Sequence, residues 1–76
     1  MRTIEGLLEF LCVRWGFCLS PDEQKRIEFK VEWSAEEFAI SVLKAEGFNP
    51  EYESKWVRRI KEKFTEYFGS DHYSKT

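Results

Sequence analysis

The sequence predicts an all-α domain: a compact bundle of three main helices plus one short helix or turn, with the last two helices forming an αα-hairpin. Three observations support it. Apolar residues recur at helical spacing near both ends of the chain. Ser, Thr or Asn precedes each expected helix, and Gly follows three of the expected ends. The 76 residues, 42% of them apolar, suffice for one domain, which we assign to residues 1–69, leaving 70–76 as a flexible tail.

The first expected helix spans residues 3–15. Thr3 can cap its start, and Gly16 is a natural stop beyond its last turn. Phe10, Val13 and Phe17 fall outside the main apolar stripe, so this helix is apolar on more than one side. Either a second element or a partner must cover the extra face. The main stripe consists of Ile4, Leu7, Leu8, Leu11 and Trp15.

The next segment carries two conflicting patterns. Ser20, Pro21 and Glu23 have the form of a capping box, which predicts a short helix over residues 21–28. Residues 26–33 instead alternate between apolar and charged side chains, as strands do. A strand needs a mate, and the candidate with the same alternation, residues 11–19, overlaps the second half of the first helix, which the pairing would dismantle. We therefore favour the helix and leave residues 26–33 open between helix, extended linker and strand.

The second half of the chain predicts two helices joined by a tight turn. Ser34 begins another capping box ahead of a helix over residues 35–46. Asn49 as N-cap and Pro50 at the first helical position then open a helix over residues 50–68. The short link makes the two an αα-hairpin. The apolar residues of the last helix are Tyr52, Trp56, Val57, Ile60, Phe64, Tyr67 and Phe68.

The chain contains two cysteines, Cys12 and Cys18. If residues 12–18 are helical, the two lie about 9 Å apart along the axis, beyond the roughly 7 Å between the Cα atoms of a disulfide. We therefore predict that both are reduced, small apolar residues. The first residues do not resemble a secretory leader, and no apolar run reaches the roughly 20 residues of a membrane span. We expect a cytoplasmic protein without membrane association.

Catalytic and metal-binding groups are sparse. His72 is the only histidine and lies in the expected tail, so no Ser-His or Cys-His pair can form on a rigid element. The cysteines do not form a C-x-x-C pair, and the sequence has no Gly-rich phosphate loop. Paired carboxylates do occur, but they lie at the expected helix starts, where capping and the helix dipole already account for them. We expect neither an enzyme nor a bound cofactor or metal.

A run of basic residues between positions 55 and 63 supports one functional hypothesis, nucleic-acid binding. Its candidate residues are Lys55, Arg58 and Arg59, on the second helix of a helix-turn-helix outline. Acidic residues occupy the expected first turn of that helix, where they would repel phosphates. The spacing also pairs Glu51 with Lys55 and Arg58 with Glu62. Because the net charge is -2 as well, this hypothesis is the disfavoured alternative.

The aromatic content supports the preferred hypothesis. Aromatic residues make up 17% of the chain, with seven Phe, three Trp and three Tyr, and a domain this small buries only about 60% of its chain surface. Exposed aromatics beside Arg are typical of interface cores. We therefore predict a small protein-interaction or adaptor module that binds another protein or itself, as a homodimer. Some of Phe10, Phe17, Trp33, Tyr52 and Trp56 should stay partly exposed, and the first four are the candidate interface residues.

Overall fold

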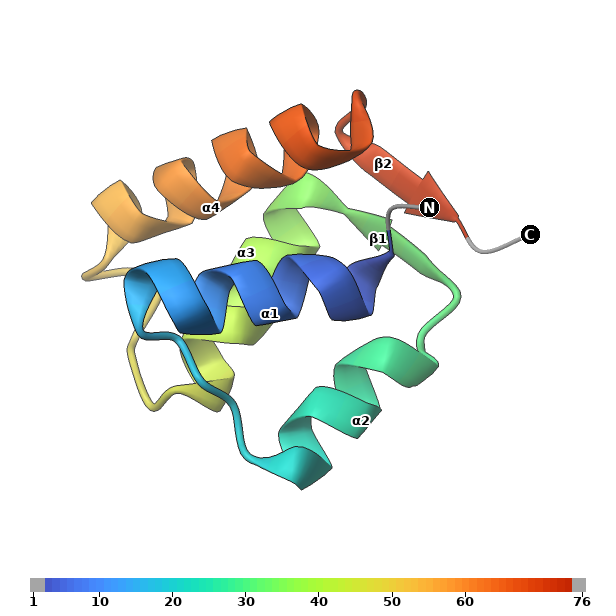
Figure 1. Cartoon of the computed structure of the whole chain (residues 1–76). Helices are drawn as coiled ribbons and strands as arrows, with labels where there is room; N and C mark the ends of the chain where they lie inside the picture. Colours follow the sequence, from blue (N-terminus) through green and yellow to red (C-terminus); the bar gives the residue numbers. More distant parts are fainter. Residues whose placement is uncertain (1–2, 75–76) are drawn as a thin grey trace.

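The computed structural model describes residues 3–74, in which four helices surround a common core and two short strands form an antiparallel sheet (Figure 1). The chain is therefore mostly helical, as predicted, but the all-α class misses the sheet. In chain order, the elements of the described residues are α1 (Ile4–Trp15), α2 (Pro21–Phe29), β1 (Glu32–Ser34), α3 (Ala35–Ala45), α4 (Ser54–Phe68) and β2 (His72–Ser74).

Side-chain caps begin the first three helices at the predicted residues. The Thr3 hydroxyl accepts a hydrogen bond from the Gly6 N–H at 3.0 Å, at the start of α1. The Ser20 hydroxyl accepts from the Glu23 N–H at 3.4 Å, at the start of α2. Ser34 caps α3 in the same way at 3.2 Å. These bonds satisfy backbone donors that a first helical turn leaves free, and they confirm the predicted helix starts.

Helices α3 and α4 pack against each other, as the hairpin prediction requires, but their connection is longer than predicted. Asn49 does not cap α4: its side-chain oxygen accepts from the Glu51 N–H at 3.0 Å. Its carbonyl accepts from the N–H groups of Tyr52 and Glu53, at 3.0 and 3.1 Å. These bonds close an isolated turn. Glu53 then departs from helical geometry (φ -114°, ψ 40°), so α4 begins only at Ser54.

The hydrophobic core joins residues of all four helices and of β1. On α1 it follows the predicted stripe as far as Leu11, and on α3 the buried residues have the same spacing, because residues three and four positions apart lie on one side of a helix. On α4 only Ile60 and Phe64 are buried, and partly buried aromatic rings surround them. The buried members are Ile4, Leu7, Leu8, Leu11, Phe17, Ile27, Trp33, Ala35, Phe38, Ala39, Val42, Leu43, Ile60 and Phe64.

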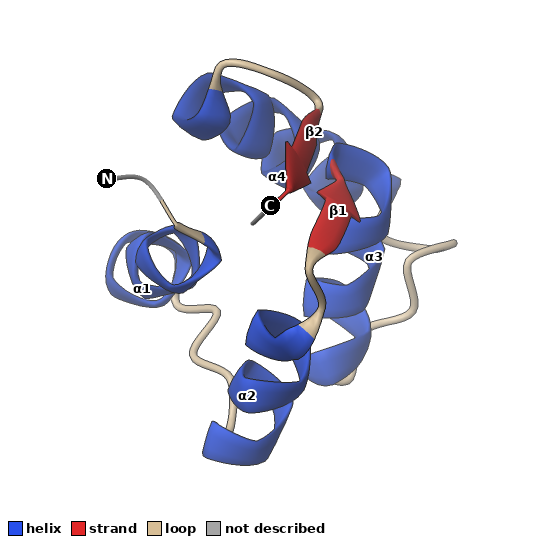
Figure 2. Cartoon of the chain, turned by 90° about the vertical axis from the view of Figure 1, so that its right-hand side faces the viewer, coloured by secondary structure: helices blue, strands red, loops and turns tan. Residues whose placement is uncertain are grey.

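The two strands lie side by side in Figure 2, with Trp33 of β1 opposite Tyr73 of β2. The sheet ties the end of the chain to the connection between α2 and α3. Residues 72–74, which the sequence assigns to a flexible tail after Gly69, instead form β2. Residues 75–76 of that predicted tail lie outside the described residues.

The structure also shows which conformation residues 26–33 adopt, which the sequence leaves open. Helix α2 continues to Phe29, and the backbone then becomes extended, so that β1 begins at Glu32. The alternating pattern thus marks a real strand, but only its last residues belong to it. The strand pairs with residues 72–74 rather than with a segment of the first helix, so the pairing leaves α1 intact.

The bonding state of the two cysteines differs from the prediction. Gly16 adopts the left-handed conformation (φ 78°), and the Phe17 N–H donates to the Leu11 carbonyl at 3.1 Å. The chain therefore folds back directly after α1. Cys12 and Cys18 consequently form a disulfide, with their Cα atoms 4.2 Å apart. The prediction of two reduced cysteines is wrong because it extends the helix past Gly16. Since disulfides persist mainly in oxidising compartments, one reason for expecting a cytoplasmic protein is also removed.

Candidate interaction surface

The four candidate interface aromatics separate into two buried and two accessible residues. Phe17 and Trp33 are only 6% and 4% exposed, so both belong to the core rather than to the accessible surface expected for them. Phe10 is half-buried on α1. Tyr52 is 83% exposed and lies outside the helical stripe predicted to include it, because α4 begins two residues later.

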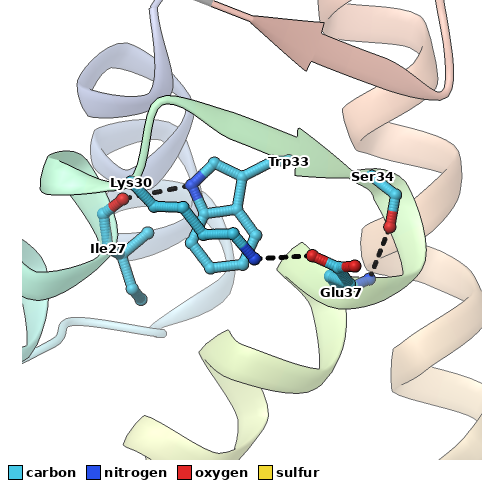
Figure 3. A network of polar contacts seen from close by, with 5 residues as sticks. All are labelled: Ile27, Lys30, Trp33, Ser34 and Glu37. Atoms are coloured by element: carbon cyan, nitrogen blue, oxygen red, sulfur yellow. Dashed lines mark hydrogen bonds and ion pairs between the residues drawn. The ribbon is translucent and has the colours of Figure 1, made fainter.

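Trp33 connects several elements of the fold through its side chain, as Figure 3 shows. Its indole Nε1 donates to the carbonyl of Ile27 at 3.1 Å. The Lys30 ammonium lies 4.3 Å from the centre of the Trp33 ring and pairs with the Glu37 carboxylate at 2.6 Å. A buried Trp usually needs a partner for its N–H. These contacts join the end of α2, strand β1 and the first turn of α3.

A row of aromatic rings joins α1 to α4. Phe10 and Trp15, both from α1, have ring centres 5.9 Å apart, and the Trp15 ring lies 5.9 Å from Trp56 of α4. Phe17 continues the row into the core, 5.0 Å from Trp56 and edge-on to it. Rings in such arrangements attract each other beyond the effect of the area they bury. The row therefore fixes α1 relative to α4, while Phe10, Trp15 and Trp56 remain partly accessible.

Two basic side chains of α4 lie over this row. The guanidinium carbon of Arg59 is 5.3 Å from the centre of the Trp15 ring and 5.0 Å from that of Trp56. The ammonium of Lys63 is 4.1 Å from the centre of the Phe10 ring. Cations within about 6 Å of a ring centre are attracted by the ring face. We call these five residues, Phe10, Trp15, Trp56, Arg59 and Lys63, the aromatic–basic surface.

The sequence identifies only part of this surface. It singles out Phe10 and Arg59 and counts Trp56 among the surplus aromatics. It assigns Trp15 to the core stripe, however, and includes Lys63 only in the basic run. The sequence signal that could have identified the α4 part of this surface is the spacing of Trp56, Arg59 and Lys63, which places all three along one side of a helix.

The outer side of α1 carries an exposed apolar residue beside this surface. Val13 is 73% exposed, and it lines a shallow hollow of about 270 Å³ together with Gly6, Glu9, Phe10 and Arg14. Val13 thus supplies the extra apolar side of α1 that the sequence predicts. Because Phe10 also belongs to the aromatic–basic surface, the hollow and that surface are continuous.

The three candidate nucleic-acid residues lie together on α4. Lys55, Arg58 and Arg59 are exposed, and they line a groove of about 470 Å³ together with Ser54 and Glu62. We call this the α4 groove. Arg59 belongs both to the groove and to the aromatic–basic surface, so the two are adjacent.

The structure weakens two sequence-based objections to anion binding by α4. The first turn of α4 contains no acidic residue, although Glu53 directly precedes it as the N-cap residue. In addition, the pairs expected between Glu51 and Lys55 and between Arg58 and Glu62 do not form in the part of the chain that the structure describes. Glu51 lies in the preceding turn rather than one helical turn below Lys55.

Residues 3–74 offer no cluster of three or more His, Cys, Asp or Glu side chains that could hold a metal ion. In the same range, no helix is both long enough and apolar enough to cross a membrane. His72 is exposed on β2.

Comparison with known proteins gives no family for the chain. No protein-family model matches it, and neither a curated protein nor a solved structure matches it.

Proposed function

We propose that this protein is a protein-interaction or adaptor module that binds its partner through the aromatic–basic surface and the neighbouring Val13. The observation that supports the proposal most is the position of Arg59 over the rings of Trp15 and Trp56. Trp and Arg are among the residues most enriched in interface hot spots. Binding, rather than catalysis, is the function proposed.

The arrangement favours binding because its side chains are already ordered. Fixing a free arginine side chain costs about 2 kcal/mol of rotamer entropy, and two aromatic rings already restrict Arg59. The rings of Trp15 and Trp56 are in turn held by the aromatic row. A partner that contacts these groups therefore orders few additional side chains, which lowers the free-energy cost of association.

The proposal is tested by replacing Val13 with Glu. Val13 is largely exposed, so the charge should leave the fold intact while disrupting an apolar contact. Tagged wild-type protein, Val13→Glu and the control Lys25→Glu, an exposed residue of α2, are each used to capture proteins from extracts of the native cells. A partner retained by wild type and control but lost from Val13→Glu agrees with the proposal. Equal capture by all three contradicts it.

Self-association is one form of this proposal and has its own test. Light scattering after gel filtration gives the mass of the wild type and of Val13→Glu in low and high salt. A salt-insensitive dimer that Val13→Glu converts to a monomer would make a second copy of the chain the partner. A monomeric wild type in both buffers would assign the surface to a different protein.

Nucleic-acid binding through Lys55, Arg58 and Arg59 is the second candidate function. It is favoured by the exposure of these side chains and by the absence of acidic residues from the first turn of α4. Such binding should weaken steeply between about 50 and 200 mM salt because it releases counterions from the phosphates. Salt-insensitive binding, or binding unaffected by Arg58→Glu with Arg59→Glu, would contradict it.

A further inference from the structure

We infer that the α4 groove receives a short acidic segment of the partner protein, with two or three neighbouring carboxylates held by Lys55, Arg58 and Arg59. This inference rests on the proposed function and names the chemistry of the partner. The groove adjoins the aromatic–basic surface through Arg59, so one partner segment can contact both.

The basic side chains of the groove are not paired with carboxylates. Within residues 3–74, neither Lys55 nor Arg58 forms an ion pair with a carboxylate, and Arg59 contacts aromatic rings instead. Lys63, by comparison, is paired with Glu66 at 3.2 Å. The three basic groups therefore have free donors, and an acidic partner can bind them without first breaking an internal pair.

The orientation of Arg59 also suits a carboxylate ligand. Its guanidinium lies over Trp15 and Trp56 and borders the α4 groove. A guanidinium binds a carboxylate through its edge while its face stacks on aromatic rings. The two contacts are therefore compatible, and the rings restrict the arginine before the carboxylate arrives.

The acidic residues of α4 favour an acidic peptide over a nucleic acid. Glu62 lies in the groove itself, and Glu66 follows one helical turn later. A continuous polyanion that followed α4 beyond the groove would meet both carboxylates, whereas a short segment with two or three charges can end within the groove, before Glu66. The net charge of -2 also disfavours a partner with a long run of phosphates.

The experiment measures fluorescence anisotropy with a labelled peptide that carries three adjacent Glu and one Leu. The matched peptide replaces each Glu with Gln, and a single-stranded oligothymidylate is the nucleic-acid probe. The Glu peptide should bind the wild type at least about tenfold more tightly than the Gln peptide, and Arg58→Glu should weaken it by about tenfold or more. Lys25→Glu makes the same charge change on α2 and should stay within about twofold of the wild type.

Several results would overturn the inference. Equal binding of the Glu and Gln peptides, no binding of the Glu peptide, or equal losses in Arg58→Glu and Lys25→Glu would each exclude acidic recognition by this groove. Tighter binding of oligothymidylate than of the Glu peptide would assign the groove to nucleic acid instead. Circular dichroism of each variant checks that the fold is retained.

The capture experiment with Val13→Glu keeps the two proposals distinguishable, because Val13 lies on α1 outside the groove. If Val13→Glu loses the partner while Arg58→Glu retains it, the interaction module stands and the acidic segment is wrong. If both variants retain every captured protein, both proposals are wrong.

Discussion

The indole Nε1 of Trp33 donates a hydrogen bond to the carbonyl of Ile27 at 3.1 Å. Ile27 lies in the last turn of α2, where the final carbonyls have no partner within the helix. This helix ends without a glycine, and the residue that follows it, Lys30, is extended. A buried strand residue therefore completes the end of a helix, and the same side chain anchors that helix to the core.

Replacing Trp33 with Phe should destabilise the protein by about 1–3 kcal/mol, because it leaves the Ile27 carbonyl without its partner and removes part of a buried ring. Urea unfolding followed by circular dichroism measures the change. The control is Phe29→Leu, at a residue that is 83% exposed, which should change the free energy of unfolding by less than about 0.5 kcal/mol. Equal effects of the two substitutions would contradict a role for the indole hydrogen bond.

The helix starts are predictable from the sequence because capping is local. Ser20 and Ser34 each accept from an N–H three residues ahead, and such a pattern can be seen without the rest of the fold. The sheet is only partly signalled in this way. The alternation over residues 26–33 indicates a strand, but β1 itself has only three residues, as does β2, and nothing near residues 26–33 indicates that residues 72–74 pair with them.

Replacing both Cys12 and Cys18 with Ser should lower the melting temperature. The disulfide closes a short loop, for which the chain-entropy model gives about 2 kcal/mol, equivalent to a shift on the order of 10 °C in a domain of this size. Thermal unfolding with and without a reducing agent measures it. The reductant should lower the wild-type melting temperature toward that of the double variant and leave the variant unchanged. An unchanged wild type, shown by mass spectrometry to be reduced, would contradict this prediction.

The candidate surface is only partly predictable because burial depends on how separate elements meet. An aromatic surplus indicates that some rings stay accessible, but not which ones. Phe17 is buried because the chain reversal at Gly16 returns its ring to Trp56. Phe10, in the middle of α1, stays half-buried. The glycine itself predicts the reversal at Gly16. The burial of Phe17 and the pairing of the cysteines, however, can be predicted only when the three-dimensional path of the chain after Gly16 is known.

Replacing Gly6 with Ala should destabilise the protein, although the same change in an isolated helix stabilises by about 1 kcal/mol. A Cβ atom at Gly6 would overlap the hydroxyl oxygen of Tyr67 on α4. The Tyr67 ring packs edge-on against Phe68, with centres 5.0 Å apart, so moving it disturbs a second contact. We expect a net loss of about 1–3 kcal/mol, measured by urea unfolding.

A double-mutant cycle tests the cause of that loss. In the Tyr67→Phe background the hydroxyl is absent, so Gly6→Ala should cost clearly less than in the wild type, or become stabilising. Strictly additive effects would show that the Tyr67 hydroxyl is not the obstacle. The contact between α1 and α4 at this position would then be looser than the structure indicates.

Strand β2 should contribute to stability despite its length. Tyr73 lies opposite Trp33 in the sheet, and its ring centre is 4.3 Å from that of Phe68. Tyr73→Ala should therefore destabilise the protein by about 1–3 kcal/mol, because it removes a partly buried ring and uncovers Phe68. His72→Ala, at an exposed neighbour that keeps the backbone pairing, should cost less than about 0.5 kcal/mol. If urea unfolding gave the same small change for both, residues 72–74 would behave as the flexible tail that the sequence alone predicts, and the sheet would add no measurable stability.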